Sequence, residues 1–480
     1  MEGHVSTLPE FRNTKIVCTI GPATSSLERI RDLILAGMDV VRLNFSHGNH
    51  ATHRQVLRLT REISRELGKE VGILQDLGGP KIRLGKLPFQ ERELQVGEKI
   101  AFSPTEGKEP DLIPVNYPYI IEDVAVGDSI LLADGLIFLK VVAKEADRIV
   151  CEVIVGGVIQ SHKGMNLPSS SLRVPTFTKK DLEDLTLGLE EGVDFVALSF
   201  VRHESDLEPV REMLNTYGNP PLLIAKIEKP QAIERLEKIL AKVDGVMVAR
   251  GDLGVEMPLE EVPIIQKRIV RMARQSAKPS IVATQMLRSM INSPRPTRAE
   301  AADAANAVLD GTDALMLSDE TAMGDYPIEA VKILDRIARE AERHLHAGSF
   351  INEPTSGALS VTASAIGRAA CYMAEELKAS AIVAGTTSGS TARLIARFRP
   401  ACPVLGLTPN QWTARQLTLS WGVIPALVAR FTETDEVFKL ARLWALEHRI
   451  VQVGNRLVIT AGVPVGKPGT TNLLKVIEIE

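Results

Sequence analysis

The sequence predicts an α/β protein built around a (β/α)8 TIM barrel, because eight short apolar runs alternate with helical patterns along most of the chain. Each run is rich in Val, Ile and Leu, which is typical of strands buried on both faces of a parallel sheet. The stretches between most of them have helical periodicity, as residues 263–276 do. The eight predicted strands are residues 15–20, 39–45, 71–75, 193–200, 222–227, 245–249, 279–283 and 314–317.

The third and fourth predicted strands are too far apart for a single barrel connection. The residues between them are rich in Val, Ile and turn signals and have little helical periodicity. Asp134-Gly135, a frequent hairpin-turn pair, lies between two short runs at 129–134 and 136–141. The sequence therefore predicts an inserted β-barrel lid domain after strand 3. Its two roots are rich in Gly, Pro or Ser, which suits a hinge over the barrel mouth.

A third region follows the barrel and predicts a small, doubly wound α/β domain. Helical stretches such as 391–398 lie between most of its short apolar runs. The runs are residues 381–385, 404–407, 423–428, 456–461 and 473–479. The predicted domains are the catalytic barrel at 1–80 and 176–345, the lid at 81–175 and the C-terminal domain at 346–480.

Composition excludes several classes of protein. A chain of 480 residues with 45% hydrophobic residues can form two or three domains, each with its own core. The net charge of -4, without blocks of like charge, argues against nucleic acid or an anionic membrane as the main partner. Cys18, Cys151, Cys371 and Cys402 are far apart and form no C-x-x-C pair, so neither a zinc site nor a disulfide framework is indicated. Without a signal-peptide or membrane-span pattern, we expect a cytoplasmic protein.

Polar residues follow most of the predicted barrel strands. In this fold the active site lies at the C-terminal ends of the strands, so these residues are the candidates for chemistry. They are Arg42, Asn44, Ser46, Asp76, Lys226, Glu228, Arg250, Asp252, Thr284, Ser318 and Glu320. Their cationic, acidic and hydroxyl side chains suit an anionic substrate and a divalent metal.

Lys226-Ile227-Glu228 and Asp252 are the sharpest of these signals. Strand alternation places Lys226 and Glu228 on one side, where an acid can bind a metal and an ammonium can meet a phosphoryl group. The alternative is a simple ion pair at a strand end. Asp252 lies between Gly251 and Gly254, and could share Mg2+ with Glu228 while backbone amides bind an anion. The alternative here is an ordinary tight turn.

Two further segments are weaker when taken alone. Arg42, Asn44 and Ser46 share one face of a strand end, which would suit a phosphate and a cation; the alternative is a polar loop. His47 has no metal-ligand spacing and is best interpreted as a solvated histidine. In the C-terminal domain a Thr- and Ser-rich loop could bind phosphate, although helix N-capping is the better interpretation from the residues alone. The loop consists of Thr386, Thr387, Ser388, Gly389, Ser390 and Thr391.

Taken together, six segments closely resemble pyruvate kinase, and the resemblance covers essentially the whole chain. The segments are residues 42–48, 75–83, 224–228, 246–256, 283–290 and 316–323. The resemblance implies Mg2+- or Mn2+-dependent phosphoryl transfer from phosphoenolpyruvate to ADP, giving pyruvate and ATP in the final step of glycolysis. It also implies a homotetramer, and a phosphorylated effector bound by the loop at 386–391.

The resemblance also implies roles for individual residues. Arg42 and Lys226 would hold the phosphoryl group, and Lys226 would also stabilise the enolate left behind. Glu228 and Asp252 would bind Mg2+. The amides of Gly251 and Asp252, with the Thr284 hydroxyl, would hold the substrate carboxylate, and Thr284 would help to relay a proton. The nucleotide-contacting positions would be Asn44, Phe45, Ser46, His47, Arg83 and Lys163.

The monovalent-cation site departs from the common family pattern. Most members are activated by K+, at positions that match Asn44, Ser46, Asp76 and the backbone of Leu77. A nearby glutamate is typical of those members, whereas this chain has Lys81. A fixed ammonium could replace the missing cation, so we expect activity without added K+.

Two other function classes remain as alternatives. A lyase or aldolase that handles pyruvate on a related barrel would also need Mg2+ and a stabilised enolate, but it would not explain the lid, Lys163 or Arg83. A non-enzymatic metabolite sensor that uses only the C-terminal domain would not need the intact set of polar residues in the barrel.

Overall fold

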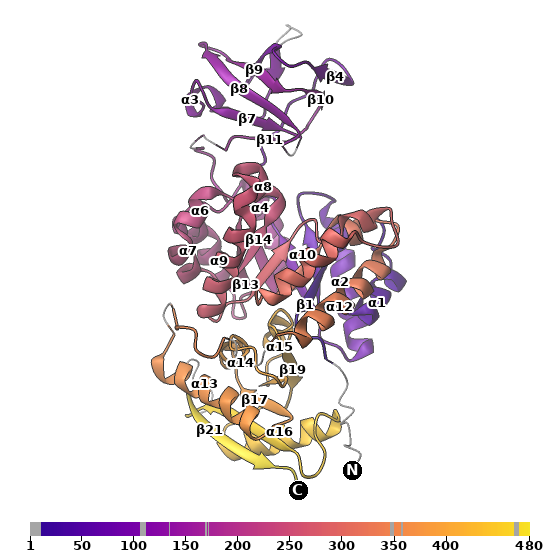
Figure 1. Ribbon diagram of the computed structural model, residues 1–480, viewed down its shortest axis with the longest axis vertical. Helices are drawn as coiled ribbons and strands as arrows, with labels where there is room; N and C mark the ends of the chain where they lie inside the picture. Colours follow the sequence, from indigo (N-terminus) through magenta and orange to yellow (C-terminus); the bar gives the residue numbers. More distant parts are fainter. Residues whose placement is uncertain are drawn as a thin grey trace.

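The barrel is closed by eight parallel strands in the computed structural model (Figure 1), which describes residues 11–105, 112–133, 135–168, 170, 172–345, 350–356, 359–464 and 470–480. The strands are β1 (Lys15–Thr19), β2 (Val40–Asn44), β3 (Gly72–Asp76), β12 (Phe195–Leu198), β13 (Leu222–Ile227), β14 (Gly245–Ala249), β15 (Ser280–Ala283) and β16 (Ala314–Leu317). They follow one another around the ring, and β16 closes it by pairing with β1. All eight predicted barrel strands are therefore confirmed.

Helices cover the outside of the barrel, and the strands are therefore largely buried on both faces. The larger helices are α1 (Leu27–Ala36), α2 (His50–Leu67), α4 (Lys179–Glu191), α5 (Glu208–Asn215), α7 (Leu236–Lys242), α9 (Val262–Gln275), α10 (Arg298–Leu309) and α12 (Pro327–Arg343). The shorter ones are α6 (Pro230–Glu234), α8 (Arg250–Glu256), α11 (Asp319–Ala322), η1 (Glu204–Leu207), η2 (Leu259–Glu261) and η3 (Arg288–Ile291). Capping boxes begin α4 at Thr178 and α10 at Thr297.

The insertion between β3 and β12 is an all-strand unit apart from the short α3 (Ile120–Asp123), and it stands at the far end of the barrel from the C-terminal domain (Figure 1). Its strands are β4 (Glu91–Leu94), β5 (Lys99–Ser103), β6 (Leu112–Pro114), β7 (Ser129–Leu132), β8 (Ile137–Lys144), β9 (Ile149–Val155), β10 (Gly157–Gln160) and β11 (Met165–Asn166). They form a six-stranded sheet and a separate pair. The expected hairpin is present, since Leu132 pairs with Ile137; Asp134 of its turn lies outside the described residues.

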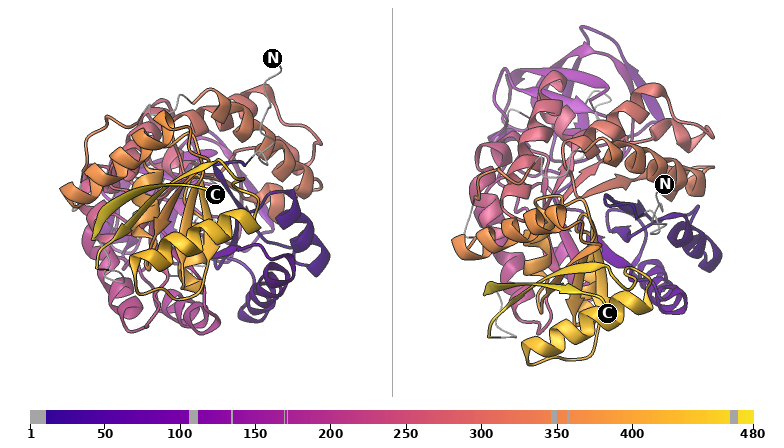
Figure 2. Two further views of the ribbon diagram at one scale, coloured as in Figure 1. Left: turned by 90° about the horizontal axis from the view of Figure 1, so that it is seen from below. Right: turned by 60° about the horizontal axis from the view of Figure 1, so that its bottom comes forward.

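The C-terminal domain is a five-stranded sheet with helices on both faces (Figure 2). Its elements are α13 (Val361–Glu376), β17 (Ala381–Gly385), α14 (Ser390–Ala396), β18 (Val404–Thr408), α15 (Gln411–Leu417), β19 (Val423–Leu427), α16 (Thr434–Glu447), β20 (Arg456–Gly462) and β21 (Thr471–Glu478). Ile382 of β17 packs in one cluster with α13 and α14, whereas Val383 packs with α16 on the other face. The doubly wound architecture and its five strands are confirmed.

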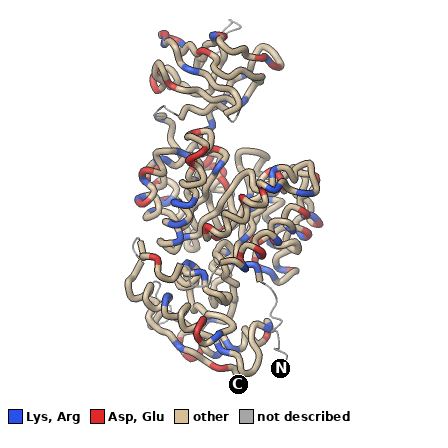
Figure 3. The backbone as a smooth tube through the Cα atoms, viewed as in Figure 1, with Lys and Arg blue, Asp and Glu red and all other residues tan. Residues whose placement is uncertain are grey.

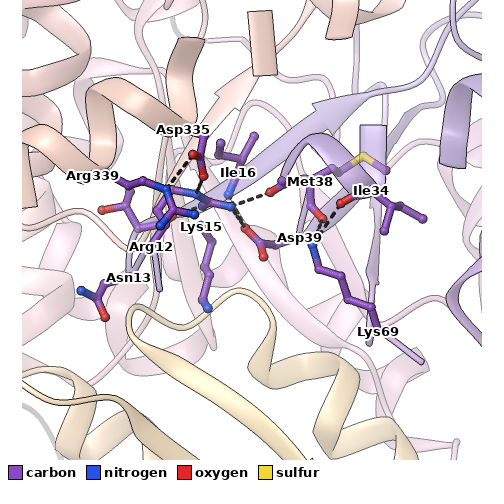
Figure 4. Close-up of polar contacts among 12 residues, drawn as sticks. Arg12, Asn13, Lys15, Ile16, Ile34, Met38, Asp39, Lys69, Asp335 and Arg339 are labelled. Atoms are coloured by element: carbon purple, nitrogen blue, oxygen red, sulfur yellow. Dashed lines mark hydrogen bonds and ion pairs between the residues drawn. The ribbon is translucent and has the colours of Figure 1, made fainter. Parts of the chain in front are cut away.

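A buried charge network lies at the end of the barrel that faces the C-terminal domain (Figure 4). Arg12 donates from Nε to Asp335 at 2.8 Å and from Nη2 to Asp39 at 2.9 Å. Lys15, the first residue of β1, donates to the carbonyl of Val423 in β19 at 2.9 Å, so a barrel side chain is bonded directly to the C-terminal sheet. Burial lowers the pKa of Lys15 to about 8, while Asp39 opposes the shift.

Lys and Arg are interspersed with Asp and Glu along the chain (Figure 3), in line with the small net charge. In the parts of the chain that the structure describes, no helix is long and apolar enough to cross a bilayer.

Candidate active site

A cavity of about 500 Å³ lies between the C-terminal ends of the barrel strands and the roots of the lid. His47, Lys81 and Asp252 line its barrel side, and Arg83 and Lys163 line its lid side. These residues come from segments far apart in the sequence, and parallel strands that end at one rim bring them together. The strand-end rule therefore located a real cavity, and more of its charged lining residues are cationic than acidic.

Asp76, at the end of β3, is the centre of a buried ion-pair network at this rim. Arg42 of β2 donates to Asp76 Oδ2 from Nε at 2.8 Å and approaches it with Nη2 at 2.6 Å. Lys226 Nζ lies 3.4 Å from Oδ1 of the same carboxylate. Burial alone would raise the pKa of Asp76, but Lys226 and Arg42 outweigh it and hold that pKa below its ordinary value. Asp76 therefore stays ionised and holds the two cations side by side.

Lys226, in β13, is fixed in direction by a short hydrogen-bond chain. Its Nζ donates to Ser199 Oγ at 2.7 Å, and Ser199 donates in turn to the carbonyl of Leu77 at 2.7 Å. Burial alone would lower the pKa of Lys226, whereas Asp76 and Glu228 raise it above its usual range. Lys226 is thus a permanent charge of defined position, with a side chain only 12% exposed.

Glu228 follows β13 and has one carboxylate oxygen without a hydrogen-bond partner. Its Oε1 accepts the amide of Phe200 at 2.5 Å, and Oε2 lies 3.5 Å from Lys226 Nζ. Oε2 is buried and accepts no hydrogen bond. Burial raises the pKa of Glu228 to about 7; Lys226 opposes this shift, and the nearby Asp252 adds to it. A buried carboxylate whose ionisation is made more costly by a second acid suits a bound cation.

The described residues contain no cluster of three or more His, Cys, Asp or Glu side chains placed to hold a metal. A divalent ion would therefore take its protein ligands from Glu228 and Asp252, and its other oxygens from substrate or water. This is the usual situation for Mg2+, which keeps several waters and binds through one or two carboxylates. The buried, unpartnered oxygen of Glu228 fits this arrangement.

Thr284 and Gly251 meet at the neighbouring strand ends. The Gly251 amide donates to Thr284 Oγ1 at 2.8 Å, and that hydroxyl donates to the Ala283 carbonyl at 2.6 Å. Thr284 has a φ of 71°, in the left-handed region that costs a β-branched residue energy. Arg250 supports this conformation by donating to the Thr284 carbonyl at 2.7 Å while it pairs with Asp303. A strained threonine held in this way is typical of a functional site.

Two family models match the chain: "Pyruvate kinase, barrel domain" over residues 11–331 and "Pyruvate kinase, alpha/beta domain" over residues 364–477. The chain belongs to the pyruvate kinase family. It is 47% identical over 471 residues to a pyruvate kinase of Sporosarcina psychrophila, with 97% of this chain and 80% of that protein covered. It is 47% identical over 482 residues to "Pyruvate kinase 2" of a Synechocystis species, with 98% and 80% covered. With a pyruvate kinase of Clostridium acetobutylicum it shares 42% over 473 residues, with 98% and 100% covered.

The nucleotide positions implied by the pyruvate kinase resemblance lie around the cavity with one qualification. His47, Arg83 and Lys163 line it. Asn44 and Ser46 lie beside them at the end of β2, where the Ser46 amide donates to Asn44 Oδ1 at 3.2 Å. The side chain of Phe45 is instead buried in the barrel core, with its ring stacked on His53 at 4.1 Å between centroids. Strand alternation turns its side chain away from that of Asn44, its amide donates to the Asp76 carbonyl and its carbonyl accepts from Lys180, so a nucleotide contact at Phe45 stays a prediction.

Two candidates from the strand-end rule have structural roles. Glu320 is 2% exposed and accepts the amides of Leu287 and Ser318 at 3.0 and 2.7 Å. It therefore fixes the turns after β15 and β16. Neither Glu320 nor Ser318 is among the residues that line the cavity, and their expected part in substrate or metal binding stays a prediction.

Two residues at the rim were missed from the sequence. Thr19 accepts a hydrogen bond from Arg42 Nη1 at 2.9 Å, and Ser199 links Lys226 to the Leu77 carbonyl. Both lie at the C-terminal ends of predicted strands, so the same rule applied to all eight strands would have found them. They are small hydroxyl residues that carry no charge signal of their own.

The loop in the C-terminal domain links β17 to α14, as its sequence suggested. The Gly389 amide donates to Thr386 Oγ1 at 2.9 Å, and the Thr387 carbonyl accepts from Asn410 and Thr413 at 2.8 and 2.7 Å. Gly389 has a φ of 80°, which lets the loop turn into the helix. These bonds, one within the loop and two from Asn410 and Thr413, hold the loop in place, and its role as an effector site stays a prediction.

Proposed function

We propose that this chain catalyses Mg2+-dependent phosphoryl transfer from phosphoenolpyruvate to ADP, with pyruvate and ATP as products. The observation that carries the proposal is the pair of cations, Arg42 and Lys226, held by Asp76 beside Glu228, whose buried Oε2 accepts no hydrogen bond. The cations suit a transferring phosphoryl group, whose charge must be stabilised as it moves. The lyase or aldolase alternative is not favoured, because the family is that of pyruvate kinase.

The chain's own residues would divide the chemistry as follows. Arg42 and Lys226 bind the phosphoryl oxygens, and Lys226 remains charged to stabilise the enolate oxygen once the phosphoryl group leaves. The amides of Gly251 and Asp252 would bind the carboxylate, which would replace the Thr284 hydroxyl as the acceptor of the Gly251 amide. Thr284 holds its hydroxyl close to the reacting carbon to help move a proton. Glu228 and Asp252 would hold Mg2+, which would supply further charge stabilisation for the transferring group.

The lid side of the cavity supports nucleotide binding. Arg83 and Lys163 present cations toward the space above His47 and Asp252. Phosphate oxygens of ADP would bind them, and a lid that closes over the nucleotide would exclude water and limit hydrolysis.

We further propose that the chain divides into domains at residues 80/81, 175/176 and 345/346, and that it forms a homotetramer. We also propose a cytoplasmic location and a phosphorylated effector bound at residues 386–391.

The direct test is to mix the protein with phosphoenolpyruvate, ADP and Mg2+, and to follow ATP and inorganic phosphate by phosphorus NMR and pyruvate by proton NMR. Equal amounts of ATP and pyruvate are expected, and none when ADP or Mg2+ is left out. Release of inorganic phosphate instead of ATP, or ligand binding without turnover, would contradict the proposal and favour the sensor alternative.

Lys81 is expected to make K+ dispensable. Lys81 lines the cavity, where burial of its ammonium lowers its pKa, Lys226 adds to this and Asp252 opposes it. Lys81→Glu should lower activity without K+ by about tenfold, or about 1.4 kcal/mol, and added K+ should restore it. Lys86→Glu, on an exposed neighbour, is the matched control. Strong K+ stimulation of the unaltered protein would refute this expectation.

Binding of Mg2+ is expected to weaken as the pH falls. The pKa of Glu228 in the metal-free protein is raised to about 7, so below that pH a proton occupies the oxygen that the metal needs. The apparent Kd for Mg2+ should therefore rise toward about tenfold per pH unit below about pH 7, and level off above it. Isothermal titration calorimetry of the protein with Mg2+ alone measures this. An affinity that is constant between about pH 6 and about pH 8 would contradict it.

A further inference from the structure

Glu256, the last residue of α8, is a buried carboxylate to which none of the roles above is assigned. It is 6% exposed. Its Oε1 accepts two hydrogen bonds, from Lys229 Nζ at 2.7 Å and from Asn166 Nδ2 at 3.0 Å, and its Oε2 is buried without a hydrogen-bond partner. Burying a carboxylate is costly unless it is paired, so this position requires a physical reason.

The single oxygen joins three elements that carry the site. Lys229 directly follows Glu228 at the end of β13. The helix that ends at Glu256 carries Gly251 and Asp252 near its start. Asn166 belongs to β11 in the lid, close along the chain to Lys163. Glu256 Oε1 therefore connects the two candidate metal ligands to the lid segment that carries the nucleotide-side lysine.

The contact lies where the lid meets the barrel rather than at the lid's outer end. Residues 82–84 and 162–165 form the root to which Asn166 belongs: the Leu84 amide donates to the Lys163 carbonyl at 2.9 Å, and the Met165 amide to the Ile82 carbonyl at 2.9 Å. Arg202, past β12, holds the segment that leaves the lid by donating to the carbonyls of Leu172 and Val174 at 2.6 and 3.1 Å. The Arg202 bonds restrain the chain as it leaves the lid, whereas Glu256 restrains the segment that carries Lys163.

We propose that Glu256 is a positioning residue that sets the orientation of the lid over the active site through its bond with Asn166. Lys229 neutralises the carboxylate and keeps it directed toward Asn166, and a hydrogen bond to a charged acceptor is stronger and shorter than a neutral one. The distance between Lys163 and Asp252 across the cavity, and so the fit of ADP, depends on the bond from Asn166 to Glu256. The nucleotide part of this inference rests on the proposed function.

Asn166→Ala removes the lid bond and leaves the Lys229–Glu256 pair in place. It should raise the KM for ADP by about tenfold, which corresponds to about 1.4 kcal/mol, and change the KM for phosphoenolpyruvate by less than about twofold. Glu256→Gln keeps an oxygen that can accept from Asn166 and should have a smaller effect on the KM for ADP. Gln90→Ala, which removes an exposed amide elsewhere in the lid, is the matched control. A rise in both KM values together would indicate a structural defect instead.

Lid orientation can be measured without any substrate. Spin labels at Val158→Cys in the lid and Leu259→Cys on the barrel occupy side chains that are 45% and 72% exposed, while Cys18, Cys151 and Cys371 are buried and Cys402 is half-buried. A labelled sample without introduced cysteines gives the background. Asn166→Ala should broaden or shift the distance distribution between the labels in the ligand-free protein. An unchanged distribution would overturn the proposal, even in an active kinase. A broadened one in a protein that does not turn over phosphoenolpyruvate would keep the lid contact and reject the function.

Discussion

Replacing Lys226 with Met is expected to lower kcat for pyruvate formation by at least about a thousandfold, equivalent to about 4 kcal/mol of transition-state stabilisation. Met nearly matches the length of the lysine stem but carries no charge. The ammonium lies 3.4 Å from Asp76 and 3.5 Å from Glu228, in a site whose low exposure strengthens its electrostatic interactions. Its loss would leave the departing enolate oxygen and the moving phosphoryl group without the nearest fixed cation.

The variant must be separated from one that does not fold. Removing the ammonium leaves the buried carboxylates beside it without a compensating charge, which is unfavourable. Lys226→Met should therefore also lower the thermal midpoint. Arg42 still neutralises Asp76, and the loss should be modest for that reason. Lys238→Met, on the exposed side of α7, controls for the loss of a lysine. If folded Lys226→Met keeps more than about a tenth of the wild-type kcat, the assigned role is wrong.

A second measurement on Lys226→Met distinguishes a role in enolate stabilisation from a role in phosphoryl transfer. Exchange of the methyl protons of pyruvate with solvent, followed by NMR in heavy water, needs an enolate but no phosphoryl donor. Lys226→Met should slow this exchange as well as the forward reaction, because the same ammonium faces the enolate oxygen. Unchanged exchange combined with lost phosphoryl transfer would restrict Lys226 to the phosphoryl group.

The barrel could be predicted from the sequence because its strands are buried on both faces. Such strands must be continuous apolar runs, and short runs like the one at β14 leave little room for another interpretation. The C-terminal sheet was predictable for the same reason, since all its central strands are buried. The polar residues of the site then followed from one topological rule, that the C-terminal ends of parallel strands lie at one rim.

The parts that could not be predicted depend on contacts between distant segments. The rule places a residue at the rim but does not say where its side chain is directed. Glu320 accepts two backbone amides, whereas one carboxylate oxygen of Glu228 accepts no hydrogen bond. Asn166 and Glu256 are 90 positions apart and meet only because the lid stands in one orientation. No local pattern distinguishes either residue from an ordinary polar side chain.

Glu228→Gln is expected to lower kcat by about a hundredfold to a thousandfold and to weaken Mg2+ binding, because it removes a charged metal ligand without changing the size of the side chain. An amide oxygen can still accept from the Phe200 amide, so the turn after β12 should persist. Calorimetry with Mg2+ and steady-state kinetics give the two effects separately. Glu234→Gln, on an exposed residue of α6, is the matched control. Full activity with unchanged Mg2+ affinity would exclude Glu228 as a ligand.

Without metal, Glu228→Gln should become more stable relative to the wild type as the pH rises. The pKa of Glu228 is raised in the metal-free folded protein to about 7, so the folded state binds more protons than the unfolded state between the ordinary carboxyl pKa and that value. Wild-type stability is therefore lost as the pH rises through this window, and Gln, which does not ionise, does not lose it. The difference in thermal midpoint, Glu228→Gln minus wild type, should become more positive from about pH 5 to about pH 8 without metal. Saturating Mg2+ should reverse the difference by stabilising only the wild type, since a ligand stabilises the state that binds it. A carboxylate that costs stability until the metal arrives is what a site selected for catalysis, rather than for stability, would contain.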